Sequence, residues 1–453
     1  MADSMIRDMT RGPVVAQLFR FAMPLFASNA LQAVYNLVDM VIVGNCIGAA
    51  GMSAVSIGGD ILHLLTFVAM GFSSAGQVII ARAVGAKQHD QIRKTIGTMF
   101  SFLLSAAAVI AVLCFLLRHQ VLGWLNTPRA SEAFAMDYMV TCICGLVFIY
   151  GYNIVSAILR GMGDSRRPFV FIAIAAILNT VLDILFVKYF GMQVFGAALA
   201  TVIGQGVSFV TAIIYLYRRR ESFGFDFRRA SFRIDGGAFR QLLALGIPMA
   251  IQSAAISFSK IVLMAWINLF DVTYSALAGI FNKVNIVSGV ISMSFTTAGS
   301  TMAGQNLAAA EHRRVNQILA TVLAVGLGLA AVFTLIMVLW PDAVYSAFTK
   351  DASVLTAASV LTVPIIVNFF GSATRSAAFS LINGSGRPKL NLAIALIDGV
   401  IARIGLAALL GFAMHLDCYG FWMGDSLAGM MPFVIGGAFY LSGRWKENKK
   451  EAA

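Results

Sequence analysis

Two aspartates lie inside long apolar stretches of this 453-residue chain, Asp39 in QAVYNLVDMVIVG and Asp183 in ILNTVLDILFV. Asn179 precedes Asp183 by four residues, so on a helix the two side chains share one face. A charge at bilayer depth costs at least roughly 2.5–3.5 kcal/mol on insertion scales and therefore indicates a function. Two carboxylates that face one cavity repel each other or share a cation or a proton. The bland alternative is that each acid pairs with a buried base or caps a helix kink.

The composition places these acids in a membrane protein. The chain is 59% hydrophobic and only 12% charged, with a mean hydropathy of +0.82. Soluble globular chains carry about 25% charged residues, so this chain cannot cover the surfaces of two or three soluble domains. The composition excludes a water-soluble enzyme and a disordered chain, and it predicts an integral membrane protein.

Apolar segments long enough to cross a bilayer, which takes about 20 residues as a helix, recur along the whole chain. Their hydrophobicity is continuous and does not alternate as in a membrane β-barrel, which favours helices. The predicted fold is therefore all-α with 12 transmembrane helices. The predicted segments are 16–43, 53–80, 95–117, 132–158, 169–187, 194–217, 241–266, 275–303, 316–340, 354–382, 390–411 and 419–442.

The basic residues set the orientation of these helices. The chain has 33 Lys and Arg and a net charge of +12. With the amino terminus inside, 25 of them fall in cytoplasmic segments and four fall in outer loops, namely Arg118, Arg129, Lys188 and Lys350. This asymmetry follows the positive-inside rule and predicts a multi-pass protein of the cell membrane with both termini in the cytoplasm. The charge excess thus reflects topology and contact with the lipid bilayer, not nucleic-acid binding.

The sequence also repeats itself. FAMPLF around Pro24 returns as LGIPMA around Pro248, FSSAGQ returns as FTTAGS, and GMGDSRRP is echoed by GSGRP. These matches keep their order at a nearly constant separation, which indicates a duplication. We expect an amino-terminal six-helix lobe over 1–222, a cytoplasmic linker over 223–240, and a carboxy-terminal six-helix lobe with a short tail over 241–453. Six helices per lobe make the repeats parallel, around a central cleft of the kind that transporters use for alternating access.

The duplicated six-helix plan, the prolines that open the first and seventh helices, the DMVIVG stretch, and Gln77 with Gly85 resemble the multidrug and toxic compound extrusion (MATE) family. The resemblance covers nearly the whole chain. It implies a secondary transporter that exports organic compounds and takes up a coupling cation.

The resemblance further implies that a cation site of the amino-terminal lobe binds sodium or a proton. The matching positions here are Asp39, Asn179, Asp183 and Thr201, and the backbone at Ala197 joins them. Sodium prefers oxygen ligands of these types, whereas a proton needs a single carboxyl group, and the sequence leaves both ions open. Some branches of the family have coupling acids in the other lobe.

The nearest acid in the second lobe is Asp398, whose neighbour Arg403 suggests an ion-paired role instead. Lys260 and Asp60 are further intramembrane charges, for which structural pairing or snorkelling is favoured over direct transport. Other polar residues are equally expected to contact substrate in an amino-lobe cavity or to join helices by hydrogen bonds. They are Gln32, Tyr35, Asn36, Tyr138 and Asn153.

We therefore predict a monomeric antiporter that exports amphipathic, cationic organic compounds, such as drugs and toxins, in exchange for Na⁺ or H⁺. It would need no cofactor beyond that coupling ion. A flippase for a lipid-linked precursor is the runner-up, but it would need a basic cavity and additional helices. An integral membrane enzyme is the third class, and it would need clustered catalytic groups. No P-loop, HExxH or GxSxG motif is present, so the chain is not expected to hydrolyse ATP or to be an enzyme.

Overall fold

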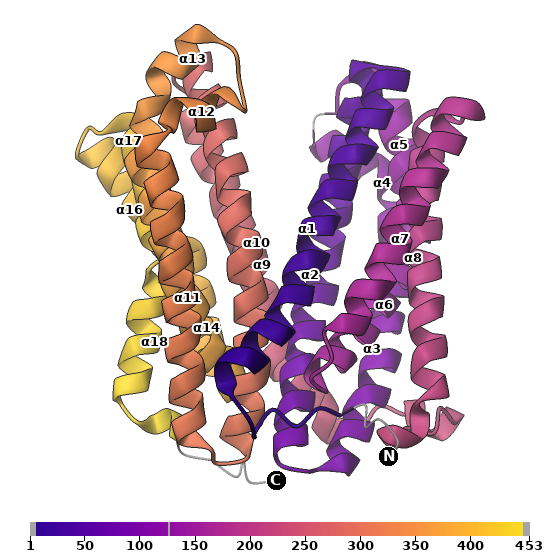
Figure 1. The fold of residues 1–453 in the computed structure, drawn as a ribbon. Helices are drawn as coiled ribbons and strands as arrows, with labels where there is room; N and C mark the ends of the chain where they lie inside the picture. Colours follow the sequence, from indigo (N-terminus) through magenta and orange to yellow (C-terminus); the bar gives the residue numbers. More distant parts are fainter. Residues whose placement is uncertain (1–5, 126, 447–453) are drawn as a thin grey trace. The chain divides into compact units, whose positions relative to one another are not determined.

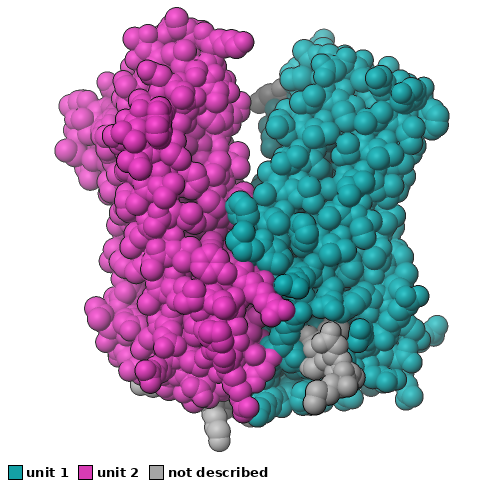
Figure 2. Space-filling model, in the orientation of Figure 1, with its two compact units in different colours: residues 1–7, 23–246 teal, residues 8–22, 247–453 magenta. Residues whose placement is uncertain are grey.

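The computed structural model describes residues 6–125 and 127–446, and every regular element in those residues is a helix. The chain forms two compact units. Unit 1 comprises Met1–Arg7 and Met23–Gly246, and unit 2 comprises Asp8–Ala22 and Ile247–Ala453. Figure 2 colours the residues of each unit. The end of the predicted cytoplasmic tail, 447–453, lies outside the described residues.

Unit 1 contains the first six long segments of the chain (Figure 1). A break at Gly145 separates α5 from α6, and a short π-helical stretch, η1, extends α7. The elements are α1 (Val14–Ile47), which enters the unit at Met23, α2 (Ala49–Gly85), α3 (His89–Leu116), α4 (Arg118–Trp124), α5 (Arg129–Cys144), α6 (Leu146–Gly161), α7 (Arg166–Asp183), η1 (Ile184–Tyr189), α8 (Gln193–Arg218), η2 (Arg220–Ser222) and η3 (Arg229–Phe232).

Unit 2 repeats this order with more interruptions. Its elements are α9 (Gly236–Ile267), which enters at Ile247, α10 (Val272–Ala308), α11 (His312–Leu339), α12 (Pro341–Ser346), α13 (Ala352–Ala357), η4 (Ala358–Leu361), α14 (Thr362–Ser385), α15 (Pro388–Leu396), η5 (Ile397–Ala402), α16 (Arg403–Ala408), η6 (Leu409–Ala413), α17 (Asp417–Ala428), α18 (Met431–Leu441) and η7 (Arg444–Lys446).

The duplication seen in the sequence extends to backbone detail. The helices α2 and α10 both have 37 residues, and α3 and α11 both have 28. Left-handed backbone recurs at matched positions, with φ of 57° at Lys87 and 61° at Ala310, and of 52° at Gln193 and 47° at Asp417. Non-glycine residues rarely adopt such angles, so their recurrence indicates that both repeats fold with the same local turns.

Each unit contains the beginning of the other repeat's first helix. The division falls between Ala22 and Met23 in α1 and between Gly246 and Ile247 in α9, in each case one residue before a proline, Pro24 or Pro248. A proline inside a helix removes a backbone hydrogen bond and favours a kink, so both helices change unit at a locally weakened point. The predicted linker 223–240 lies within unit 1.

Ten described helices are long and apolar enough to cross a membrane, and the pair α5 and α6, bent by 49°, makes an eleventh. The twelfth predicted segment, 419–442, is occupied by the shorter helices α17 and α18, which are interrupted at Gly429 and Met430. The all-helical, duplicated membrane fold expected from the sequence is thus confirmed, and its last span is broken.

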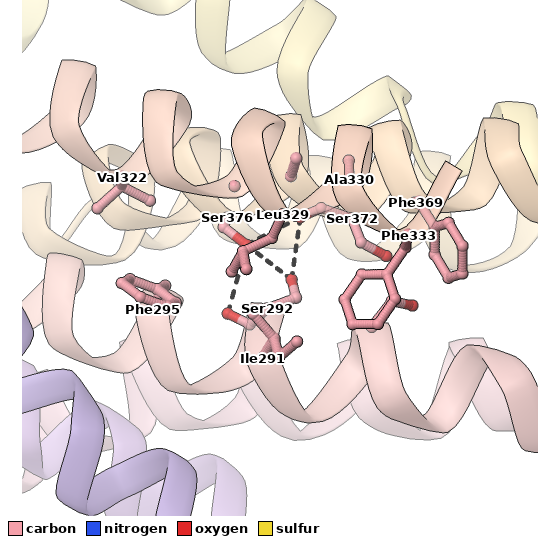
Figure 3. A pocket seen from close by; sticks show the side chains of 13 residues that line it. Ile291, Ser292, Phe295, Val322, Leu329, Ala330, Phe333, Phe369, Ser372 and Ser376 are labelled. Atoms are coloured by element: carbon pink, nitrogen blue, oxygen red, sulfur yellow. Dashed lines mark hydrogen bonds between the residues drawn. The ribbon is translucent and has the colours of Figure 1, made fainter. Parts of the chain in front are cut away.

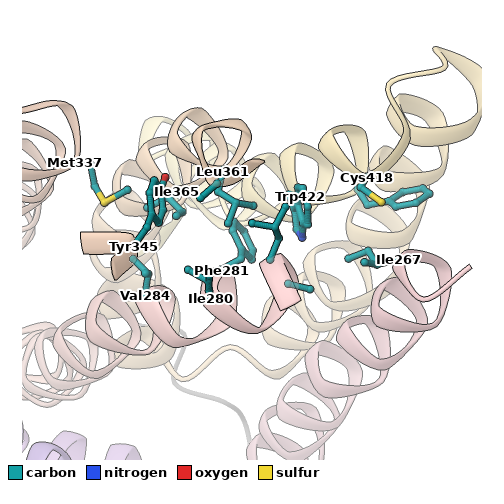
Figure 4. Close-up of a cluster of buried hydrophobic side chains, with 14 of the residues drawn as sticks. Ile267, Ile280, Phe281, Val284, Met337, Tyr345, Leu361, Ile365, Cys418 and Trp422 are labelled. Carbon is teal, nitrogen blue, oxygen red and sulfur yellow. The ribbon is translucent and has the colours of Figure 1, made fainter. Parts of the chain in front are cut away.

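Apolar cores fill the interior of each unit. In unit 2, Phe281, Tyr345 and Trp422 are at most 3% exposed and belong to one cluster that joins helices from α9 to α17 (Figure 4). The hydroxyls of Tyr345 and Thr362 are 2.8 Å apart, so the one polar atom of that buried ring is satisfied. In unit 1, the buried ring of Tyr138 belongs to a corresponding cluster with Val43 and Ala197.

Candidate functional site

Three helices of unit 1, α1, α7 and α8, contribute the residues of the predicted cation site. Asp39 on α1 is 5% exposed, Asn179 on α7 is 4% exposed, and Asp183 is fully buried. Asp183 is the last residue of α7 before the π-helical η1. Such a bulge shifts the register of a helix and is frequent at functional sites. Asp183 is thus a buried acid next to a local change in helix geometry.

The helix α8 supplies the remaining two residues. Ala197 and Thr201 are four residues apart on one face, and the side-chain amide of Asn179 donates a hydrogen bond to the Thr201 hydroxyl at 3.3 Å. Gly204 permits this approach, because a Cβ there would lie only 3.1 Å from the carbonyl oxygen of Ala175 on α7. The absence of a side chain at Gly204 thus lets α7 and α8 pack closely beside the site.

The oxygens of this site are largely uncommitted. Asp39 Oδ1, Asn179 Oδ1 and both carboxylate oxygens of Asp183 are buried and have no hydrogen-bond partner among the described residues. The Asp39 carboxylate acts electrostatically on Asp183, which places the two acids in one neighbourhood. Burying ionised carboxylates without partners is very unfavourable, and such groups become neutral or acquire a counter-ion. An arrangement of acceptors of this kind fits a proton or a hard cation with oxygen ligands.

A small cavity with an empty volume of about 180 Å³ lies beside Asn179 and Thr201, and neither Asp39 nor Asp183 lines it. Tyr35, Asn179 and Thr201 line it, as do residues that the sequence did not single out. Those are Ala175, Ala176, Gly204 and Gln205. Gln205 follows Thr201 by four residues, so helical spacing from this predicted site residue would have pointed to it.

The other residues proposed for a substrate cavity have varied surroundings. Tyr138 is buried, and its ring occupies the space left by Gly58 on α2. The charges of Asp39 and Asp183 both act on it. Asn153 donates to the Ile149 carbonyl within its own helix at 2.9 Å. The remaining two lie on α1, where Gln32 is half-buried and Asn36 is exposed.

A larger cavity in unit 2, of about 350 Å³, has different chemistry (Figure 3). Ser292 and Ser376 lie on facing sides of it with their hydroxyl oxygens 2.7 Å apart, and both also donate to backbone carbonyls. Phe295, Phe333 and Phe369 line much of the rest. Because these two hydroxyls are satisfied within the protein, this cavity lacks the unpartnered acceptors that mark the site in unit 1.

Comparison with known proteins agrees with the duplicated architecture. The sequence profile of the MatE family matches residues 24–185 and again residues 248–409. The chain belongs to this family. It is 30% identical over 309 residues to the probable multidrug resistance protein YpnP of Bacillus subtilis, covering 68% of each chain. It is 26% identical over 427 residues to YoeA of the same organism, also called a probable multidrug resistance protein, covering 93% of this chain and 92% of YoeA.

Solved structures share the fold at lower sequence identity. One described as the outward-facing conformation of a multidrug resistance MATE family transporter has a TM-score of 0.90 and 18% identity, and the match covers 99% of this chain and 100% of that chain. A MATE crystal structure in the bent conformation has a TM-score of 0.88 and 19% identity, with 98% of each chain covered. As a MatE member, the chain is a multi-pass membrane transporter of the multidrug efflux family and not an enzyme.

The two MatE repeats have different residues and different contacts at equivalent positions. Thr201 lies eight residues after the start of α8, and Asp425 lies eight residues after the start of α17. In unit 2, the guanidinium of Arg403 donates to Asp425 and, at 3.3 Å, to Asp398. Asp398 also accepts from Arg375. The ion-paired role that the sequence suggested for Asp398 is therefore confirmed.

The remaining intramembrane charges are not paired in this way. Lys260 and Asp60 are exposed, and neither forms an ion pair within the described part of the chain. Asp60 lies one turn before His63 on α2, and the two act on each other electrostatically. The structural pairing favoured for these two residues from sequence is thus not supported by a direct contact.

Proposed function

We propose that this MatE transporter is a secondary active antiporter that exports amphipathic, cationic organic compounds in exchange for Na⁺ or H⁺. The supporting observation is the group of buried, unpartnered oxygens on Asp39, Asn179 and Asp183. Their number and type suit a small positive ion that enters and leaves. The named relatives YpnP and YoeA, both probable multidrug resistance proteins, support drug-like compounds as the exported class.

Ion binding at this site would couple export of the substrate to the ion gradient. A cation or proton at Asp39 and Asp183 offsets one of two negative charges and so relieves the repulsion between the acids at low dielectric. A conformation in which the acids stay together is favoured when the ion is bound, and one in which they are hydrated or separated is favoured when it is absent. Substrate that binds the second conformation is then exported at the expense of the ion gradient, since each ligand shifts the equilibrium by its differential affinity.

Different residues would bind the coupling ion and the organic substrate. The Asp39 and Asp183 carboxylates carry the charge that attracts the ion, and the Asn179 carbonyl and the Thr201 hydroxyl add neutral oxygen ligands. The carbonyl of the buried Ala197, one turn before Thr201 on α8, is the backbone group proposed to complete the set. We propose that five further residues contact the organic substrate in a cavity of the amino-terminal lobe, namely Gln32, Tyr35, Asn36, Tyr138 and Asn153. We further propose that the protein works as a monomer in the cell membrane with both termini in the cytoplasm.

Transport into sealed vesicles tests the proposal. Purified protein is reconstituted into liposomes, and uptake of a fluorescent organic cation is followed with a Na⁺ gradient alone, a pH gradient alone, or neither. We expect uptake with at least one gradient and none in its absence. Asp39→Asn and Asp183→Asn should each abolish the gradient-driven component. Equal uptake with and without gradients, or undiminished uptake by both variants, would show that the mechanism is wrong.

A further inference from the structure

Five charged side chains lie together in the helices of unit 2, and their charges do not cancel. Lys260 is on α9, Arg375 on α14, Asp398 in η5, Arg403 on α16 and Asp425 on α17. Three are basic and two are acidic, so the cluster has a surplus of one positive charge. An uncompensated charge at bilayer depth is costly and is normally retained for a function.

The two acids of the cluster are already used. Asp398 is fully buried and accepts hydrogen bonds from Arg375 and Arg403, and Asp425, 5% exposed, accepts from Arg403. The buried Arg403 guanidinium therefore lies between two carboxylates and neutralises much of their charge. Lys260 has no hydrogen bond or ion pair with any described residue, so the surplus charge resides on its ammonium group.

The location of Lys260 ties it to this cluster. Its neighbour Ser259 donates to the carbonyl of Gly399, which joins α9 to η5 beside Asp398. The charged groups that act on the Lys260 ammonium are Asp425, Arg403 and Arg375. The Arg375 side chain is 19% exposed and, among the described residues, donates a hydrogen bond only to Asp398, so its other N–H groups can donate to a further acceptor. Lys260 and Arg375 are thus close enough to act on each other electrostatically, and both acids of the cluster are already paired.

Lys260 in unit 2 and Asp39 in unit 1 lie at comparable positions along the first helix of their repeats. Lys260 lies three residues before Leu263, the position of α9 that corresponds to Asp39 of α1 through the two MatE matches. At comparable positions of the duplicated fold, unit 1 therefore has unpartnered acids and unit 2 has an unpartnered base. A cation suits the first environment and an anion suits the second.

We propose that Lys260, supported by Arg375, binds a carboxylate group of the transported compound. This inference rests on the transport function proposed above and narrows its substrate class to zwitterions, that is, amphipathic organic cations that also carry an acid group. The ammonium offers three donors for charge-assisted hydrogen bonds, which are strong where water is scarce. The carboxylate balances the surplus charge that Asp398 and Asp425 leave uncompensated.

A matched ligand pair isolates the carboxylate. Dansylglycine and its methyl ester share the same aromatic group and differ only in the acid. Their affinities are measured by equilibrium dialysis against full-length protein in phosphatidylcholine nanodiscs, with no ion gradient. The variants are Lys260→Gln and Lys260→Arg, with Lys350→Gln as a control that removes an exposed lysine between α12 and α13. Thermal unfolding verifies that each variant is folded.

We expect wild type and Lys350→Gln to bind the acid roughly tenfold more tightly than the ester, as one charge-assisted hydrogen bond would give. Lys260→Gln should bind acid and ester equally with ester affinity unchanged, and Lys260→Arg should retain most of the preference. Equal affinities in wild type would overturn the proposal. So would an unchanged preference in Lys260→Gln, because that is the result expected if the lysine only snorkels to the interface.

Membrane lipid is the competing source of an anionic group. Repeating the measurement with phosphatidylglycerol added should leave the acid preference intact. If the preference disappears, the headgroup phosphate occupies the site and the carboxylate proposal is wrong. Because binding is measured without a gradient, its failure differs from a failure of antiport. Loss of gradient-driven uptake with intact carboxylate preference would contradict only the antiporter, and the reverse would contradict only the carboxylate site.

Discussion

Arg403 donates into the Asp425 carboxylate at the place in unit 2 where unit 1 has Thr201 beside Asn179. Asn179 and Thr201 join α7 to α8, and Arg403 and Asp425 join α16 to α17. In each unit the first of the two helices adjoins a π-helical stretch, and an acid lies in that stretch or next to it. In unit 2 a guanidinium attached to the chain supplies the positive charge. In unit 1 no basic group of the described residues forms an ion pair with Asp39 or Asp183. One repeat therefore compensates its buried acids with a charge of the chain itself, and the other repeat has no such group at Asp39 and Asp183.

The permanent ion pair should be structural, and Arg403→Gln should reveal it. The substitution leaves Asp425 and Asp398 with less compensation in the interior of unit 2, where Arg403 is 3% exposed. Removing one partner of a buried ion pair typically costs about 3–5 kcal/mol. We expect a correspondingly lower free energy of unfolding, measured as a lower thermal midpoint of the purified protein.

Two further variants make that result specific. Arg403→Gln combined with Asp425→Asn should recover part of the loss, because one uncompensated acid has been neutralised. Arg313→Gln, at an exposed arginine of α11, should change stability by no more than about 0.5 kcal/mol. A thermal midpoint of Arg403→Gln equal to that of wild type would show that the pair does not stabilise unit 2.

Unlike Arg403→Gln, Asp183→Asn should lower transport activity and leave the stability of the protein unchanged. Both Asp183 oxygens are buried without described partners, so an amide of the same shape removes a charge and no hydrogen bond. We expect gradient-driven uptake to fall at least roughly tenfold, a change of about 1.4 kcal/mol or more. The thermal midpoint in Na⁺-free buffer should be unchanged or higher. Asp137→Asn, an exposed acid on α5, serves as the control and should transport normally. A lower midpoint together with lower uptake would point to a folding role instead.

The sequence predicted that the polar residues of the acid site lie in the interior, and it predicted less of what surrounds them there. The four-residue spacing of Asn179 and Asp183 and their apolar context are local features, and the structure brings both residues into the interior of unit 1. The hydrogen bond from Asn179 to Thr201 depends on how closely α7 and α8 pack, which Gly204 controls. Spacing alone does not reveal such a contact between helices. Asp425 was missed, although carrying the repeat offset from Thr201 into the second half would have found it.

The helix count shows a similar limit. Hydropathy predicted a single last span over 419–442, because apolar composition continues through Gly429 and Met430. The structure breaks the helix there into α17 and α18, each of which is too short to cross a bilayer alone. Hydropathy reports where a segment is apolar and not whether its backbone is continuous. The exchange of helix beginnings between the units likewise depends on tertiary packing, although Pro24 and Pro248 mark its position.

Thr201→Val should separate sodium from proton coupling. The valine keeps the shape of the side chain and removes the one hydroxyl that α8 contributes to the cavity beside Asn179. If Na⁺ is the coupling ion, it should raise the unfolding free energy of wild type by about 2.7 kcal/mol at 100 times its dissociation constant. We expect that thermal shift, and we expect Thr201→Val to need more Na⁺ to reach it. Thr201→Ser, which keeps the hydroxyl, should behave as wild type. A wild-type midpoint that is independent of Na⁺ would instead support the proton.

The position of the segment around η3, which leads into the second repeat, should depend on the lack of a side chain at Gly97 of α3. A Cβ there would lie 2.0 Å from the backbone carbonyl oxygen of Ser231 in η3, so Gly97→Ala must push that segment away from α3. The displacement would disturb the hydrogen bond that Ser101 donates to the Phe232 carbonyl and the bond at 3.1 Å from the Asp235 amide to Thr98.

Trypsin digestion can detect this displacement of the segment around η3. The arginines beside η3, Arg228 and Arg233, should become better trypsin sites, because proteolysis needs a locally opened backbone. We expect faster cleavage between the two repeats, followed by gel electrophoresis of the purified protein. Gly123→Ala, where a Cβ meets nothing within 4 Å, should be cleaved at the wild-type rate. Equal cleavage of wild type and Gly97→Ala would show that α3 does not hold the segment in place.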